Sequence, residues 1–103
     1  METYKDISSL ELNNMINNKE KIILLDVRTE AEYNTVRIPN AINIPVSDLD
    51  SQIDSLLPYK DEKVIIYCRS GKRSIYAAHL LEEYGFKNLY NLKQGIIGHL
   101  NYL

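Results

Sequence analysis

Cys68, the only cysteine in the chain, is the residue best suited to covalent chemistry. Three cationic side chains follow it closely, namely Arg69, Lys72 and Arg73. An apolar run over residues 64–67 predicts a buried strand before the cysteine, and residues 74–84 predict an amphipathic helix after it. Cys68 is therefore expected in a loop between a strand and a helix, where free amides, the helix dipole and the cations favour an anion.

These surroundings predict that Cys68 acts as a thiolate nucleophile. A free cysteine with a pKa of about 8.5 is only about 3% thiolate at pH 7, and lowering the pKa by about two units makes it about three-quarters thiolate. Gly71 permits a positive φ or a close backbone approach, which would turn successive amides toward one point. A lone cysteine is often just a small buried hydrophobe, but such a residue gains nothing from a glycine turn and three neighbouring cations.

Strand and helix patterns alternate along the rest of the chain. A continuous apolar run predicts a strand at residues 22–25, and further strands are expected at residues 41–44 and 88–92. Capping-box patterns predict helices that begin after Ser8 and after Thr29. Roughly five strands separated by helices predict an α/β domain with a mainly parallel sheet. Ligands bind beyond the carboxyl ends of the strands in such sheets, and Cys68 falls at such an end.

Three more helices are expected in the second half of the chain. One is introduced by Pro45, ends near Pro58 and has an apolar side formed by Leu49, Ile53, Leu56 and Leu57. The helix after Cys68 should end at Gly85, with an apolar face formed by Ala77, Leu80, Leu81 and Tyr84. A last helix is expected after Gly95, bearing Ile96, Ile97, Leu100 and Leu103.

Length and composition indicate one compact domain over residues 1–103. A hydrophobic content of 45% and a charged content of 25% are ordinary for a soluble globular protein. A net charge of -2 gives no basis for nucleic-acid binding, and the cations gathered near Cys68 favour a small anionic ligand. The absence of a signal-peptide core and of any membrane-length apolar run predicts a cytoplasmic protein with no membrane partner. Cysteine and histidine do not occur at metal-ligand spacing, so no metal site is expected.

Three segments, in this order, resemble the rhodanese-like domains, and the resemblance covers nearly the entire chain. Residues 25–33 (LDVRTEAEY) are similar to the family's Asp-Val-Arg element, and residues 38–45 (IPNAINIP) to its Ile-Pro-Gly-Ala-x-Asn-Ile-Pro element. Residues 67–74 (YCRSGKRS) are close to its active-site loop. The resemblance implies a rhodanese-like fold, with a five-stranded parallel sheet flanked by helices on both faces, and a sulfurtransferase in which Cys68 carries sulfane sulfur as a persulfide.

The resemblance also implies a reaction cycle that needs no cofactor. The Cys68 thiolate would attack the outer sulfur of a donor such as thiosulfate, and a thiol, a protein or cyanide would then accept that sulfur. The rest of the loop would bind the anionic donor and the persulfide, which makes the expected substrate-binding residues Arg69, Ser70, Gly71, Lys72, Arg73 and Ser74. A domain this small is expected to present Cys68 openly to its acceptor.

Two other functions remain open for this fold. The resemblance implies a C-x5-R active-site loop for phosphatases and arsenate reductases of the same fold. Cys68 and Arg73 are instead spaced as C-x4-R, which favours sulfur transfer. A catalytically silent binding or regulatory module is the other alternative, although the retained cysteine and cationic loop speak against it. Asp26 and Arg28 match a family element and are expected to support the loops as a buried ion pair more than to take part in catalysis.

The chain also departs from the family pattern. Val36 and Arg37 stand where many relatives have Gly-His, and Asn40 replaces a glycine. The usual tryptophan of the last helix is missing, its place falling near His99 or Leu100. These changes are expected to alter a turn and to open the edge of the pocket without removing the chemistry.

Overall fold

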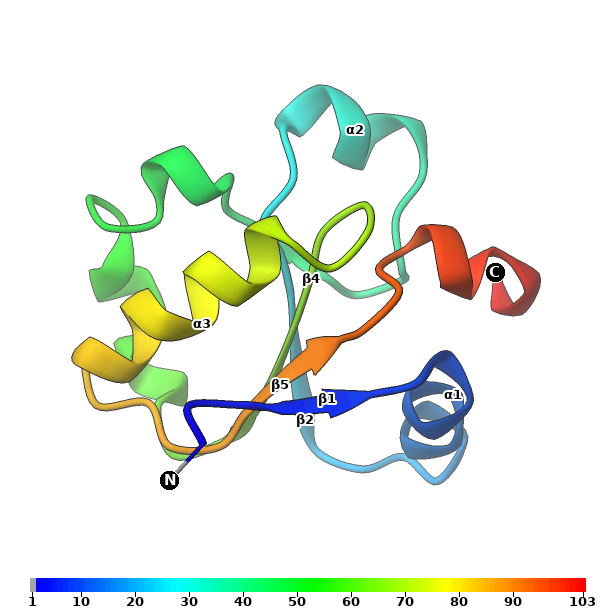
Figure 1. The fold of residues 1–103 in the computed structure, drawn as a ribbon, viewed down its shortest axis with the longest axis horizontal. Coiled ribbons are helices and arrows are strands. Elements are labelled where there is room, and N and C mark those ends of the chain that lie inside the picture. Colours follow the sequence, from blue (N-terminus) through cyan, green and yellow to red (C-terminus); the bar gives the residue numbers. More distant parts are fainter. Residues whose placement is uncertain (1) are drawn as a thin grey trace.

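A parallel sheet of five strands lies at the centre of the computed structural model, which describes residues 2–103 (Figure 1). The strand order is β1-β5-β4-β2-β3, and every neighbouring pair is parallel. The strands are β1 (Lys5–Ile7), β2 (Ile22–Asp26), β3 (Ile42–Asn43), β4 (Lys63–Tyr67) and β5 (Leu89–Leu92). This arrangement confirms the α/β class and the parallel sheet. β1 was not among the apolar runs of the sequence, because it has three residues and only Ile7 is buried.

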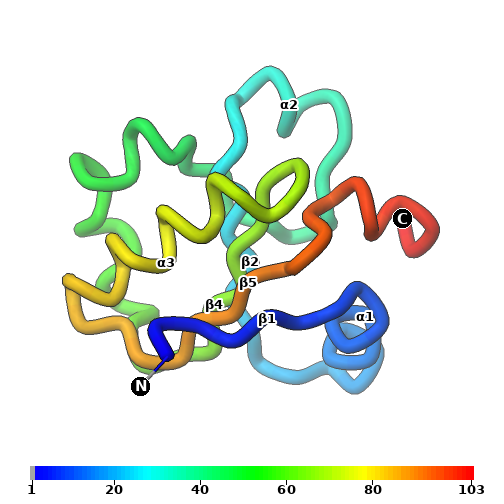
Figure 2. Tube along the Cα trace, in the orientation of Figure 1, coloured from blue at the N-terminus to red at the C-terminus, as the bar shows by residue number. Residues whose placement is uncertain are grey.

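Helices cover both faces of the sheet, as expected (Figures 1 and 2). One face packs against α3 (Arg73–Glu83) and a series of short 3₁₀ turns, and the other against α1 (Ser9–Asn17) and the C-terminal 3₁₀ helix η4 (Ile97–Tyr102). The helix α2 (Glu30–Thr35) follows β2 directly and lies beyond the carboxyl ends of the strands. The strand β4 is fully buried from Val64 to Tyr67, so the two layers hold the residue that follows it firmly in place.

Both predicted capping boxes are present. The Ser8 hydroxyl accepts a hydrogen bond from the amide of Glu11, and the Glu11 carboxylate accepts one from the amide of Ser8. Thr29 and Glu32 do the same at the start of α2. Since each box satisfies two amides that the first helical turn leaves free, these helix starts could be located from sequence.

The predicted helix between Pro45 and Pro58 is wrong. That segment forms three separate 3₁₀ turns, Val46–Asp48, Ile53–Ser55 and Leu57–Tyr59. The hydroxyls of Ser51 and Ser55 donate to backbone carbonyls three residues earlier, and such local bonds compete with a regular helix. The expected apolar side is buried apart from Leu57, which is exposed.

The expected last helix is present as the 3₁₀ helix η4, and its apolar residues do not all lie on one side. Because a 3₁₀ helix repeats every three residues, Ile96 and His99 both face the core. Ile97 and Leu100 share a different side and are 48% and 50% exposed. The predicted apolar face of α3 is right for Ala77 and Leu81, which are fully buried, but wrong for Tyr84, which is 38% exposed.

No helix formed by residues 2–103 combines the length and the apolar character needed to cross a membrane.

Candidate active site

Cys68 directly follows β4 and lies at the carboxyl edge of the sheet, where the loop leads into α3. Its Sγ accepts a hydrogen bond from the amide of Gly71 at 3.1 Å and lies 3.6 Å from the hydroxyl oxygen of Ser74. Cys68 is only 1% exposed. The expectation that the small domain presents this cysteine openly is therefore wrong, because the loop folds back over the sulfur.

The polar groups around Cys68 favour its thiolate form. Burial raises the pKa of the Cys68 thiol, but the amides of Ser74, Ser70 and Gly71 hydrogen-bond to the sulfur and favour its thiolate form, so the pKa lies below its ordinary value. The helix α3 begins at Arg73 without a side-chain cap, which leaves amides of its first turn available to the sulfur. Hydrogen-bond donors and a helix amino end lower the pKa of a thiol in the same way.

Two glycines fix the shape of the loop against the chain that follows β5. Gly71 has a φ of 95°, and a Cβ there would lie 2.4 Å from the carbonyl oxygen of Lys93. Gly95 has a φ of 63°, and a Cβ there would lie 2.2 Å from the carbonyl oxygen of Arg69. A side chain at either position would push the loop away, so both the positive φ and the close approach that Gly71 was expected to permit are present.

A chain of side-chain hydrogen bonds extends from the sulfur to the edge of the sheet. The hydroxyl of Ser74 donates to Oδ1 of Asn91 at 2.5 Å, and Nδ2 of Asn91 donates to the carboxylate of Asp6 at 2.9 Å. Ser74 and Asn91 are both buried. Sequence reasoning missed Asn91, although a polar residue inside the strand expected at 88–92 was a signal that some buried group binds it.

The cations of the loop have different surroundings. Arg73 forms two bonds with the carboxylate of Glu32 on α2, at 2.8 and 3.0 Å. The Arg73 guanidinium lowers the pKa of Glu32 to about 2, while burial works in the opposite direction. Arg69 and Lys72 are exposed, as is Ser70. The proposed donor-binding roles of these residues stay predictions, and Arg73 in addition ties the loop to α2.

Asp26 and Arg28 form a buried ion pair below α2. The guanidinium contacts both carboxylate oxygens, the shortest distance being 2.6 Å, and also donates to the carbonyl of Val36. The side chains are 0% and 3% exposed. The amide group of Asn43 donates to the carbonyls of Asp26 and Arg28, which links this pair to β3. The pair holds together the chain segments that surround the loop.

The segment that departs from the family's glycine pattern contains a left-handed residue, Asn40. Asn40 has a φ of 70°, a left-handed conformation that asparagine adopts more easily than most residues. The preceding Ile38 is buried, and its amide donates to the hydroxyl of Tyr67 at 3.2 Å. Asn40 therefore has a backbone conformation that glycine adopts readily, and the expected change of the turn stays a prediction.

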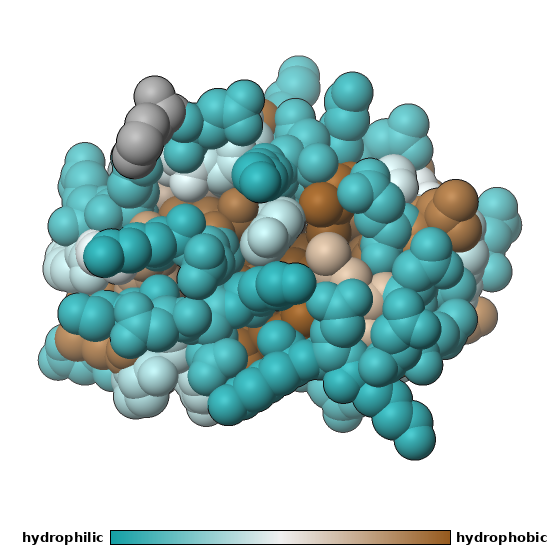
Figure 3. All heavy atoms as spheres, turned by 90° about the horizontal axis from the view of Figure 1, so that it is seen from below, coloured by the Kyte–Doolittle hydropathy of each residue, from teal (hydrophilic) through white to brown (hydrophobic). Residues whose placement is uncertain are grey.

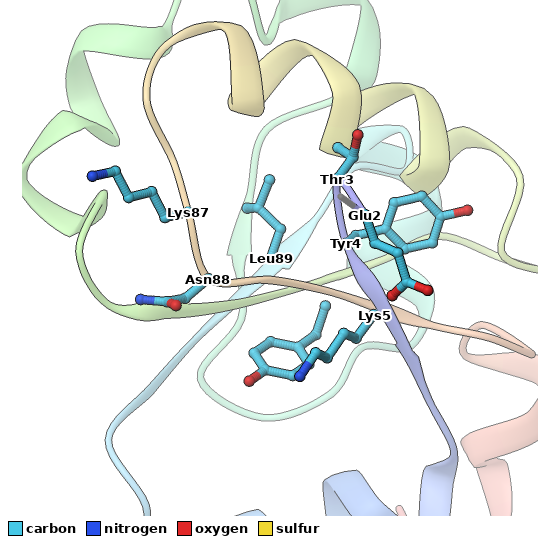
Figure 4. Close-up of a pocket in the computed structure, with 8 residues that line it drawn as sticks. Glu2, Thr3, Tyr4, Lys5, Lys87, Asn88 and Leu89 are labelled. Carbon is cyan, nitrogen blue, oxygen red and sulfur yellow. The ribbon is translucent and has the colours of Figure 1, made fainter.

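A hollow in the surface lies far from Cys68. It is formed by the start of β1 and the chain before β5, and Figure 4 shows Lys5 and Lys87 at its borders. These are the amino ends of parallel strands, opposite the edge that holds the cysteine.

On the side opposite α2, the surface is mostly hydrophilic around a stripe of hydrophobic side chains (Figure 3). Within residues 2–103 no three His, Cys, Asp or Glu side chains are grouped to hold a metal ion.

Comparison with known proteins agrees with this geometry. The sequence profile of the Rhodanese-like domain matches residues 8–99. The chain belongs to the rhodanese-like family. A sulfurtransferase from Allochromatium vinosum is 38% identical to this rhodanese-like domain over 92 residues, which cover 89% of this chain and 84% of that protein. The rhodanese-like domain protein from Staphylococcus aureus has a similar structure, with a TM-score of 0.84 and 30% identity over 92% of this chain and 90% of that one.

Some relatives are much longer than this rhodanese-like domain. A tRNA uridine(34) hydroxylase from Buchnera aphidicola subsp. Baizongia pistaciae is 38% identical over 95 residues, which cover 88% of this chain but only 30% of that protein. The similarity therefore concerns one part of the hydroxylase, and the same kind of domain occurs both as most of a protein and as a segment of a larger one.

Proposed function

We propose that this rhodanese-like domain is a sulfurtransferase that moves sulfane sulfur from a small anionic donor to a thiol acceptor through a persulfide on Cys68. The observation that carries this proposal is the contact of Cys68 Sγ with the Gly71 amide at 3.1 Å, in a loop that lowers the pKa of the thiol. Relatives named sulfurtransferase from Allochromatium vinosum and, as a putative sulfurtransferase, from Bacillus subtilis support the same activity.

The first half-reaction uses the Cys68 thiolate as nucleophile. With thiosulfate as donor, the thiolate attacks the outer sulfur, a new S–S bond forms, and the bond from the outer sulfur to the sulfonate breaks. Sulfite leaves with the electron pair of that bond, and the negative charge of the thiolate is carried by the terminal sulfur of the persulfide. Amides that point toward the sulfur stabilise this charge, as donors do in an oxyanion hole.

The second half-reaction regenerates the thiolate. An acceptor thiolate, or cyanide, attacks the terminal sulfur, and Cys68 leaves as the thiolate. The terminal sulfur lies about 2.05 Å beyond the buried Sγ, so the acceptor attacks an atom that extends from Cys68 and not Sγ itself.

Phosphate-ester hydrolysis is less compatible with this loop. A phosphatase of this type needs a guanidinium free to bind the phosphoryl oxygens. Arg73 is already bound through two nitrogens to Glu32. Its C-x4-R spacing from Cys68 also gives a narrower loop than the C-x5-R loop expected of such phosphatases.

We also propose a cytoplasmic location, because the cytoplasm keeps thiols reduced and Cys68 must be reduced at the start of each cycle.

The test is direct. The reduced protein is incubated with thiosulfate, its intact mass is measured, and cyanide is then added, with Cys68→Ala treated in parallel. We expect the gain of one sulfur atom, its loss to cyanide as thiocyanate, and no gain in the variant. Sulfur gain by Cys68→Ala, or no gain by the folded wild-type protein from either thiosulfate or glutathione persulfide, would contradict the proposal.

A further inference from the structure

A shallow groove lies beside the Cys68 loop, between α2 and η4. Its volume is about 250 Å³, and its lining includes Arg28, Glu32, Val36, Arg69, Ile97 and Leu100. Figure 1 shows the loop after β4 with α2 on one side and the C-terminal segment on another. Of the residues expected to bind the donor, only Arg69 lines this groove.

The walls of the groove are apolar side chains that nothing in the domain covers. Val36 is 38% exposed, Ile97 48% and Leu100 50%. Single exposed hydrophobic residues are common on protein surfaces, but these three line the same groove. The three-residue repeat of η4 places Ile97 and Leu100 on one side of that helix, so its 3₁₀ form creates the apolar wall.

The charges in the groove leave one net positive group. Arg28 is neutralised by Asp26, and Glu32 by Arg73. Within residues 2–103, Arg69 makes no ion pair with a carboxylate. The groove is therefore complementary to a ligand that has an anionic group at one end and an apolar group at the other.

The groove also adjoins the reacting loop, since Arg69 lines it. Arg69 follows Cys68 in sequence. The amide of Ile96 donates to the carbonyl of Cys68 at 2.9 Å, and the amide of Ile97 donates to the carbonyl of Arg69 at 3.2 Å. The apolar wall is thus held by hydrogen bonds to the residue that would attack the donor and to the cation beside it.

We propose that this groove binds the organic group of the sulfur donor, so that the domain prefers thiosulfonates with an aromatic group, R–SO₂–S⁻, over those with a methyl group. This inference rests on the proposed function. The Cys68 thiolate attacks the outer sulfur, the S–S bond forms, and the bond between that sulfur and the sulfonyl group breaks. The sulfinate R–SO₂⁻ leaves with the electron pair, and the persulfide carries the remaining negative charge.

The test compares two donors that differ only in their organic group. The kcat/KM of benzenethiosulfonate is divided by that of methanethiosulfonate, and the ratio is corrected by the reactivity of each donor toward 2-mercaptoethanol in solution. A phenyl ring that buries about half of its surface is expected to raise the wild-type ratio about tenfold. In Ile97→Asn/Leu100→Asn the ratio should fall toward one.

Two further variants serve as a surface control and as a second test of the groove. Leu10→Asn changes a leucine on α1 that is 57% exposed, and it should keep both the wild-type ratio and the wild-type rates. Val36→Thr keeps the side-chain shape but replaces one methyl group with a hydroxyl on the α2 side of the groove, and it should lower the ratio even if the double variant fails to fold. A corrected wild-type ratio of one, or the same ratio in wild type and the groove variants, would overturn the proposal.

A binding measurement separates this inference from the proposed function. Benzenesulfonate and methanesulfonate are titrated into ¹⁵N-labelled protein, and the NMR shifts of the amides of Arg69, Ile97 and Leu100 are followed. We expect shifts with benzenesulfonate that methanesulfonate does not produce. Such shifts without any sulfur transfer would support the groove and remove the sulfurtransferase function. Sulfur transfer with no such shifts would do the reverse.

Discussion

Replacing Gly71 with alanine should raise the pKa of Cys68 and lower its thiolate fraction, whereas the same change at Gly85 should not. The two glycines have almost the same left-handed backbone, with φ values of 95° and 94°. A Cβ at Gly71 would lie 2.4 Å from the carbonyl oxygen of Lys93, but at Gly85 the nearest atom is Nζ of Lys60 at 4.0 Å. Gly85→Ala is therefore a matched control that introduces the backbone strain without the collision and far from Cys68.

The size of each effect follows from these contacts. Left-handed strain costs about 1–2 kcal/mol of unfolding free energy in either variant. Gly71→Ala must also move the loop away from Lys93, which removes the amide that donates to Cys68 at 3.1 Å. A hydrogen bond to a charged group contributes about 1.5–3 kcal/mol, so its loss raises the pKa of Cys68 by about 1–2 units. Below that pKa the thiolate population then falls about 10- to 100-fold.

Because Cys68 is the only thiol, its pKa can be measured from the pH dependence of alkylation by iodoacetamide. Urea unfolding of the same samples gives the stability of each variant. We expect Gly71→Ala to lose more stability than Gly85→Ala and to be the only one of the two with a raised thiol pKa. A wild-type pKa in a folded Gly71→Ala protein, or an equal rise in Gly85→Ala, would refute the reasoning.

Three other outcomes follow from the ionisable groups. In the same alkylation assay, wild-type Cys68 should titrate below the pKa of free cysteine, because its hydrogen bonds outweigh its burial, and an ordinary pKa would contradict this. Glu32→Gln should cost about 1 kcal/mol at pH 7, since its pair with Arg73 is partly exposed. The folded pKa of Glu32 is about 2 against an ordinary 4.5, so this stability is present above pH 4.5 and lost as the pH falls through about 2, where the urea curves of the two proteins should converge. Arg28→Ala should cost about 3–5 kcal/mol because it leaves the Asp26 carboxylate buried without its charged partner, and a loss below 1 kcal/mol in urea unfolding would contradict this.

The parts of the site that sequence could predict are those determined within a few residues of chain. The strand before Cys68, the helix after it, and the need for glycine at position 71 all follow from residues 64–84. The capping boxes at Ser8 and Thr29 are local in the same sense. In each of these cases the groups that interact are neighbours in the chain, so their spacing alone carries the information.

The parts that sequence could not predict depend on pairing between distant segments. Asn91 reaches Ser74 because β5 lies next to β4, and Glu32 reaches Arg73 because α2 lies above the same edge of the sheet. The 3₁₀ form of η4 was missed for a related reason. Its apolar residues fit the period of an α-helix and that of a 3₁₀ helix about equally well, and only packing against the core decides between them.

The chemistry of the loop therefore depends on a segment that the loop's own sequence does not reveal. Gly71 lies against the carbonyl of Lys93, and Gly95 against the carbonyl of Arg69. The two segments can approach this closely because glycine has no side chain at either contact. Bonds from the chain after Gly95 to the Cys68 and Arg69 carbonyls close this contact. A rigid contact of this kind keeps the amides aimed at the sulfur before any charge develops there, which is what makes such donors effective. The turn after β5 is thus as much a part of the site as the residues that surround the thiol.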